Sequence, residues 1–227
     1  LVAACNYWQP AMPFMFERFA DYTELLMPDD LLSSNSILTA TREAMTAEAC
    51  QDVEVIGWLY QFYISEKKDQ VFDALKKNKK IEANDIPAAT QLCTPHWIVR
   101  YLVENSLGRL WLLNHPQSKL AEKMPYYIAP TQPETDFLVV TLPEDLKVCD
   151  PACGSGHMLT YAFDLLYAIY EEALYEVSQI PQLILSKNLY GIEIDERAAA
   201  LAAFALTMKA RAKQSRFLAK ATKTLPN

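Results

Sequence analysis

The last third of the chain alternates apolar runs with helical periodicity, in an order typical of an α/β sheet. Residues 146–149 form a short apolar run that predicts a buried strand ending at Asp150, and a helix is expected to follow over residues 157–177. Residues 189–194 predict a second strand, and Asp195 can cap the helix after it. Strand, helix, strand and helix in this order indicate a right-handed parallel βαβ unit. The pattern supplies only two clear strands, fewer than such a sheet normally contains.

Helical periodicity dominates the earlier part of the chain. Apolar residues recur every three or four positions over residues 46–65, which predicts one amphipathic helix. The helical spacing of the aromatic residues at 58–63 favours packing in the core over stacking on nucleic-acid bases. A shorter helix is expected over residues 67–77.

The middle of the chain contains one clear helix start followed by loops. The Thr94-Pro95 pair predicts a helix with Thr94 as its cap and Pro95 in its first position. The proline-rich stretch after this helix predicts loops and one short strand at residues 137–142. We therefore expect a mainly helical region over residues 1–90 and the α/β part over residues 91–227.

Composition narrows the setting of the protein without identifying it. The 227 residues are 51% hydrophobic and 22% charged, as in ordinary globular proteins. No apolar run reaches the roughly 18 residues that a membrane-spanning helix needs, so no membrane partner is expected. The five cysteines are odd in number and irregularly spaced, which favours a reducing, cytoplasmic location over a disulfide framework. The chain does not begin with Met, and we expect it to be part of a longer protein.

The charge distribution limits how this chain could bind nucleic acid. The formal net charge is −7, the wrong sign for a chain that grips DNA by its own overall charge. Lysines cluster at residues 76–80, and basic residues without any acid fill residues 209–223. We interpret both as solvated surfaces, so that DNA contacts made by this chain would be local.

The two predicted strands each end in residues suited to a ligand. The turn after Asp150 contains Gly154 and Gly156, which leave room for a ligand at the carboxyl end of the strand, where open α/β sheets bind cofactors. Glu193 ends the second strand, where a carboxylate can accept hydrogen bonds from both ribose hydroxyls of a nucleoside. Together the two strand ends predict a nucleoside pocket.

The details of the turn favour S-adenosylmethionine among nucleoside cofactors. The third glycine of a dinucleotide fingerprint is missing, which disfavours a nicotinamide-dependent dehydrogenase, and no phosphate-binding P-loop is present. Asp150 would repel a pyrophosphate and suits a cationic ligand. The spacing of Cys149, Cys153 and His157 could suggest a metal site, but we interpret these as strand and turn residues and expect no metal.

Three segments resemble the motifs of the amino-group DNA methyltransferases of the gamma class. The heptad Asp-Pro-Ala-Cys-Gly-Ser-Gly at residues 150–156 resembles their first cofactor motif, and residues 191–195 resemble their second. The Thr-Pro segment at residues 94–99 precedes both, in the order of the subgroup whose target-recognition domain is C-terminal. Residues 57–68 and 86–91 are similar to the large adenine-specific methyltransferases of BREX phage-defence systems.

The resemblance implies a Rossmann-like sheet that binds S-adenosyl-L-methionine. Thr94 would contact the methionine end and Asp150 the amino group, while Glu193 would bind the ribose and Ile194 would pack against the adenine. The implied cofactor-binding residues are Thr94, Asp150, Ala152, Gly154, Gly156, Glu193 and Ile194. The spacing from Asp150 to Glu193 departs from a compact unit, being about twice the usual 20 residues.

The resemblance also implies a catalytic element that this chain lacks. Family members catalyse with an Asn/Asp/Ser-Pro-Pro-Tyr/Phe loop, and the chain contains no Pro-Pro dipeptide. We therefore expect the loop and the domain that binds double-stranded DNA to lie beyond Asn227, with no catalytic residue in this chain. The implied function is site-specific N6-adenine DNA methylation in a restriction-modification or phage-defence system, with other defence proteins as partners. The alternative is a methyltransferase-like binding scaffold without catalysis.

Overall fold

The computed structural model describes residues 1–18, 22–27, 30–31, 33–53 and 55–220, and helices dominate it. The α-helices are α1 (Val2–Trp8), α2 (Ile37–Ala44), α3 (Val55–Tyr63), α4 (Ser65–Lys76), α5 (Ile86–Thr90), α6 (His96–Val103), α7 (Arg109–Asn114), α8 (His157–Glu172), α9 (Ile180–Leu183), α10 (Glu196–Lys213) and α11 (Phe217–Lys220). The π-helical turns are η4 (Glu104–Gly108) and η7 (Ile184–Asn188), and the 3-10 turns are η1 (Tyr22–Leu26), η2 (Ala49–Gln51), η3 (Ala83–Asp85), η5 (Leu120–Lys123) and η6 (Pro143–Asp145). The strands are β1 (Val148–Asp150) and β2 (Leu189–Gly191).

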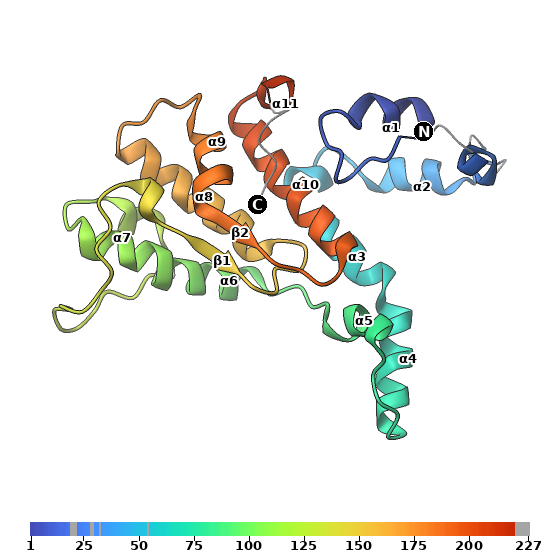
Figure 1. Cartoon of the computed structure of the whole chain (residues 1–227), viewed down its shortest axis with the longest axis horizontal. Coiled ribbons are helices and arrows are strands. Elements are labelled where there is room, and N and C mark those ends of the chain that lie inside the picture. Colours follow the sequence, from blue (N-terminus) through green and yellow to red (C-terminus); the bar gives the residue numbers. More distant parts are fainter. Residues whose placement is uncertain (19–21, 28–29, 32, 54, 221–227) are drawn as a thin grey trace.

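The two strands form a small parallel sheet near the middle of the molecule (Figure 1). Val148 pairs with Leu189 and Asp150 pairs with Gly191, so both strands end at the same edge. The chain between them forms α8, and α10 follows β2, as the sequence predicts. Figure 1 shows α4 projecting away from this part, while α1 and α2 lie on the other side of α10 from the strands in this view. The expected parallel α/β arrangement is confirmed for these two strands.

The hydrophobic core lies around α8. This helix buries one side completely, with no exposed surface on Ala162, Phe163, Leu166, Ile169 or Tyr170. Helices α6, α9 and α10 and the turn η4 pack their buried residues onto it. Among the described residues, the core cluster includes none before Val99, so the earlier helices attach to this core without being part of it. The division of the chain at residue 90 stays a prediction.

A buried amide fixes the approach to both strands. Asn188, fully buried just before β2, donates hydrogen bonds from Nδ2 to the carbonyl oxygens of Pro143 (2.7 Å) and Leu146 (2.8 Å), ahead of β1. Its Oδ1 accepts a hydrogen bond from the hydroxyl of Tyr170 on α8 (2.9 Å). A buried amide with all these partners is stable only in one arrangement, so it sets how the strands lie against α8.

Two asparagines, one in η4 and one at the end of α7, hold an extended segment of the chain. Asn105 donates to the carbonyl of Tyr126 and accepts from the N–H of Ile128, each at 2.8 Å. Asn114 does the same with the carbonyl of Leu138 and the N–H of Val140, each at 2.9 Å. Each amide therefore binds alternate backbone groups as a neighbouring strand would.

The expected strand at residues 137–142 is wrong, because of this amide pairing. The segment is extended, but its backbone bonds to a side chain of the helix end and to no second strand. Alternating apolar residues predict an extended chain and do not identify its partner.

The predicted helices are mostly present, with different ends. The helix expected over 46–65 begins only at Val55, and the helix expected to reach residue 177 ends at Glu172, shortly before Leu174 adopts a left-handed φ of 62°. Pro95 takes the cap position of α6, so Thr94 lies outside the helix and does not cap it. Among the described residues, no helix is both long and apolar enough to cross a membrane.

The aromatic run at residues 58–63 does not pack in the core as expected. Phe62 is 72% exposed and Tyr63 is 71% exposed, although both lie on the helix that the pattern predicts. Trp58 and Tyr60 instead reach the segments after β1 and β2, where Trp58 meets the ring of His157 edge-on and Tyr60 bonds to Asp195. Trp58 and Tyr60 therefore attach α3 to the segments that follow the two strands.

Candidate functional site

A cavity of about 530 Å³ opens where the two strands end. Its walls come from the segments after β1 and β2, the start of α8, and the chain from α5 to α6. Six of the seven predicted cofactor-binding residues line it, and Gly156 does not. The described lining residues are Ile86, Thr90, Gln91, Leu92, Cys93, Thr94, Asp150, Pro151, Ala152, Cys153, Gly154, Ser155, His157, Met158, Ile192, Glu193 and Ile194.

The glycine turn between β1 and α8 depends on left-handed backbone at two positions. Gly154 has a φ of 53° and Gly156 a φ of 86°. Side chains disfavour this conformation, which lets glycine reverse the chain tightly into α8. A Cβ added to Gly156 would lie 2.9 Å from the Cβ of Ala202 on α10, so this glycine allows the turn to pack against α10. Gly156 thus lies outside the cavity and helps to form it by letting the turn pack closely on α10.

Glu193 joins the two strand-end segments. Its Oε2 accepts the N–H of Gly154 at 2.7 Å, and its Oε1 accepts the N–H groups of Ile194 and Asp195, each at 3.0 Å. A carboxylate has about four acceptor positions, so capacity remains for a ligand. The side chain both shapes the pocket and presents negative charge to it.

Asp150, at the end of β1, forms hydrogen bonds with the turn that follows it and with the segment after β2. Its Oδ1 accepts the N–H of Ala152 at 3.1 Å, and its carbonyl oxygen accepts the N–H of Ile192 at 2.9 Å. Ile192 in turn accepts the N–H of Cys153 at 3.0 Å. These bonds hold the two segments beside each other after the strands have ended.

The charged side chains that line the cavity are all acidic among the described residues. Asp150 and Glu193 line it, and no Lys or Arg occurs among its described lining residues. His157 also lines it, and burial, followed by the nearby charge of His96, lowers the pKa of its ring. A neutral histidine and two carboxylates favour a ligand with positive charge and repel a pyrophosphate.

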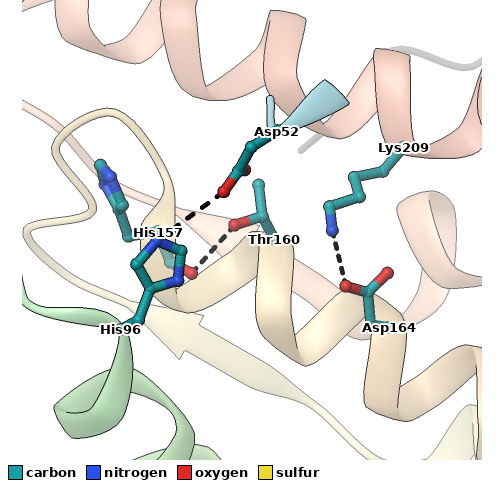
Figure 2. A network of polar contacts seen from close by, with 6 residues as sticks. All are labelled: Asp52, His96, His157, Thr160, Asp164 and Lys209. Carbon is teal, nitrogen blue, oxygen red and sulfur yellow. Dashed lines mark hydrogen bonds and ion pairs between the residues drawn. The ribbon is translucent and has the colours of Figure 1, made fainter. Parts of the chain in front are cut away.

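A polar network lies behind the glycine turn, at the start of α8 (Figure 2). Thr160 donates to the carbonyl oxygen of His157 at 2.9 Å. His96, on α6, lies 3.7 Å from a carboxylate oxygen of Asp52. An ion pair between Lys209 and Asp164, at 2.6 Å, ties α10 to α8. These contacts fix the helices on which the turn rests.

One wall of the cavity is held by helices from the first part of the chain, which the sequence analysis did not foresee. Lys68 on α4 donates to the carbonyl oxygen of Gln91 at 3.0 Å, and Gln61 on α3 accepts the N–H of Cys93 at 2.7 Å. A Cβ on Gly57 would overlap the Ser155 side chain, which shows how closely α3 approaches the glycine turn. The mainly helical region therefore helps to form the pocket.

Comparison with known proteins finds relatives along most of this chain. The chain matches the family described as MmeI, DNA-methyltransferase domain, over residues 139–226, which include both strand ends. It is 50% identical over 226 residues to the adenine-specific methyltransferase BrxX of Escherichia coli O9:H4 (strain HS), covering 96% of this chain. It is 37% identical over 221 residues to the adenine-specific methyltransferase PglX of Lacticaseibacillus casei (strain Zhang), covering 90% of this chain. This chain is a homologue of adenine-specific methyltransferases. The resemblance read from its motifs is confirmed, and the chain spans 18% of the length of each of these two relatives.

In this methyltransferase homologue, Cys153 lies in the pocket as a protonated thiol. Burial, followed by the charges of Asp150 and Glu193, raises its pKa to about 11. Among the described residues, no group of three or more His, Cys, Asp or Glu side chains is placed to hold a metal ion. We interpret Cys153 as a small residue that packs against Gly191.

The raised pKa of Cys153 predicts slow alkylation. Only the thiolate reacts, so at pH 8 iodoacetamide should modify Cys153 about two orders of magnitude more slowly than an exposed thiol of ordinary pKa. Its rate should rise about tenfold for each pH unit between 8 and 10. Peptide mapping by mass spectrometry separates Cys153 from the other four cysteines. A rate that levels off below pH 9 would contradict the raised pKa.

Proposed function

We propose that this chain forms the methyl-donor pocket of a site-specific DNA N6-adenine methyltransferase that uses S-adenosyl-L-methionine. The enzyme would act in a restriction-modification or BREX-type phage-defence system, and residues 91–227 would be part of its Rossmann-like sheet. One observation supports this most: six residues that the motifs implied surround a single cavity, whose described lining residues include two carboxylates and no lysine or arginine. A cavity lined by two carboxylates fits a nucleoside that carries positive charge.

Each lining residue would then contribute a defined contact. Asp150 would pair with the amino group of the cofactor, and Thr94 would lie at the methionine end. Glu193 would bind the ribose by accepting a hydrogen bond from a hydroxyl at its remaining acceptor position. Ile194, which is 68% exposed beside Glu193, offers apolar surface to the adenine ring.

The chain's part in the reaction would be to hold the donor in position. When bound, S-adenosyl-L-methionine supplies a methyl group on a positively charged sulfur. Enzymes that modify a base inside DNA extrude it from the duplex, and bringing the two reactants together supplies much of the rate increase. The chain has no Pro-Pro dipeptide. We therefore assign the loop that clamps the adenine, and the contacts to double-stranded DNA, to other parts of the protein.

Calorimetric titration of the full-length protein tests this function. S-adenosyl-L-methionine and S-adenosylhomocysteine are expected to bind, and NADH is not. Labelled methyl transfer to duplex DNA, followed by nucleoside analysis, is expected to yield N6-methyladenine. Binding of NADH alone would support a dehydrogenase instead. Adenosyl binding without transfer to any DNA would support a non-catalytic scaffold.

A further inference from the structure

Gln91 occupies an unusual place in the cavity wall. It follows α5, lines the cavity, and is only 9% exposed. Both of its backbone groups are bonded: its N–H donates to the carbonyl of Pro87 at 3.0 Å, and its carbonyl accepts from Lys68 at 3.0 Å. The position of this residue is therefore set by its backbone, independently of its side chain.

The side-chain amide of Gln91 has no hydrogen-bond partner among the described residues. It has two N–H donors and one carbonyl acceptor, and these atoms are not buried from solvent but are accessible from the cavity that the residue lines. Its Oε1 lies 3.5 Å from where a Cβ on Gly154 would be, at the glycine turn. Because the amide is accessible from the cavity, a molecule that enters the cavity can form hydrogen bonds with it.

The proposed methyl donor poses a problem that such an amide solves. Its amino-acid end carries a carboxylate as well as an ammonium group, and the described lining residues provide two carboxylates and no lysine or arginine. Several backbone donors in the wall are already used. The N–H groups of Ala152, Cys153 and Gly154 bond to Asp150, Ile192 and Glu193, and that of Cys93 bonds to Gln61.

We propose that the Nε2–H group of Gln91 binds the carboxylate of the donor's amino-acid end. Gln91 then selects S-adenosyl-L-methionine over adenosyl ligands that lack the carboxylate. A neutral donor is suited to this place, because a cation beside Asp150 would compete for the carboxylate that is to pair with the ligand's ammonium group. This inference rests on the proposed function.

Two ligands that differ only in the carboxylate test the proposal. The full-length protein is titrated calorimetrically with S-adenosyl-L-methionine and with its decarboxylated form. Replacing Gln91→Ala is expected to weaken binding of the first about 10- to 100-fold, since a hydrogen bond to a charged group is lost. Binding of the decarboxylated ligand should change less than about threefold. Equal losses for the two ligands would overturn the proposal.

A negatively charged side chain at position 91 provides a second test of the proposal. Gln91→Glu keeps the shape of the side chain and sets a carboxylate against the carboxylate of the donor. It should weaken S-adenosyl-L-methionine binding more than Gln91→Ala does and should not weaken binding of the decarboxylated ligand. Gln182→Ala, at an exposed glutamine of α9 outside the cavity, is the control and should change neither affinity.

The outcomes separate this proposal from the proposed function. If neither ligand binds the unchanged protein, the proposed function fails and takes the inference with it. If S-adenosyl-L-methionine binds and Gln91→Ala leaves its affinity unchanged, only the role of Gln91 is wrong. Thermal unfolding without ligand should be the same for all three variants and the unchanged protein.

Discussion

Replacing Glu193 by alanine is expected to weaken S-adenosyl-L-methionine binding about 10- to 100-fold. The change removes the acceptor proposed for a ribose hydroxyl, and a hydrogen bond to a charged group contributes about 1.5–3 kcal/mol. It also releases the N–H of Gly154, which Glu193 holds at 2.7 Å across the two strand ends. Calorimetric titration measures the affinity.

Variants at two neighbouring acids separate shape from ligand contact. Glu193→Gln still accepts hydrogen bonds but has no charge, so it should lose less affinity than Glu193→Ala. Glu196→Ala, an exposed acid outside the cavity, should bind as the unchanged protein does. Unchanged affinity in a well-folded Glu193→Ala protein would refute the assigned role.

The second large effect is on stability, at Gly156. A valine there would hold a branched side chain at a φ of 86°, and its Cβ would lie 2.9 Å from the Cβ and 3.1 Å from the Cα of Ala202. Left-handed backbone costs about 1–2 kcal/mol for such a residue, and overpacking adds about 1–3 kcal/mol. Gly156→Val should therefore lower the free energy of unfolding by about 2–5 kcal/mol in urea titrations.

Gly154 supplies the matched control for packing. It also has positive φ, but a Cβ there would meet only Oε1 of Gln91, at an ordinary 3.5 Å. Gly154→Val should lose only the conformational part, about 1–2 kcal/mol. Equal losses at the two glycines would mean that the contact with Ala202 is relieved by movement of α10.

The parts of the site that could be predicted are those encoded within short segments. Asp150 and Glu193 stand at the ends of apolar runs, and parallel strands bring such ends together whatever the rest of the chain does. Gly156 was expected among the residues that line the cavity, but it lies outside the cavity wall. A glycine in a motif indicates that another group comes close to the backbone, but it does not identify that group. Here the neighbour is Ala202, 46 positions along the chain.

The wall formed by the first part of the chain could not be predicted in this way. Lys68 and Gln61 lie on helices whose periodicity marks apolar faces, and nothing in their spacing links them to Gln91 or Cys93. Those bonds depend on how α3 and α4 meet the core, which is decided by packing in three dimensions. Gln91 is three residues before Thr94, so a search for polar residues next to the Thr-Pro motif would have found it.

The amides of Asn105 and Asn114 affect which substitutions the segment between residues 126 and 140 can tolerate. Both amides bind only peptide groups, so these four hydrogen bonds do not depend on which side chains the segment carries. Val139 already points its side chain to solvent, at 85% exposure. Substitutions at such exposed positions leave the four hydrogen bonds in place, with one chemical exception. Proline at position 128 or 140 would remove the N–H that the amide oxygen needs.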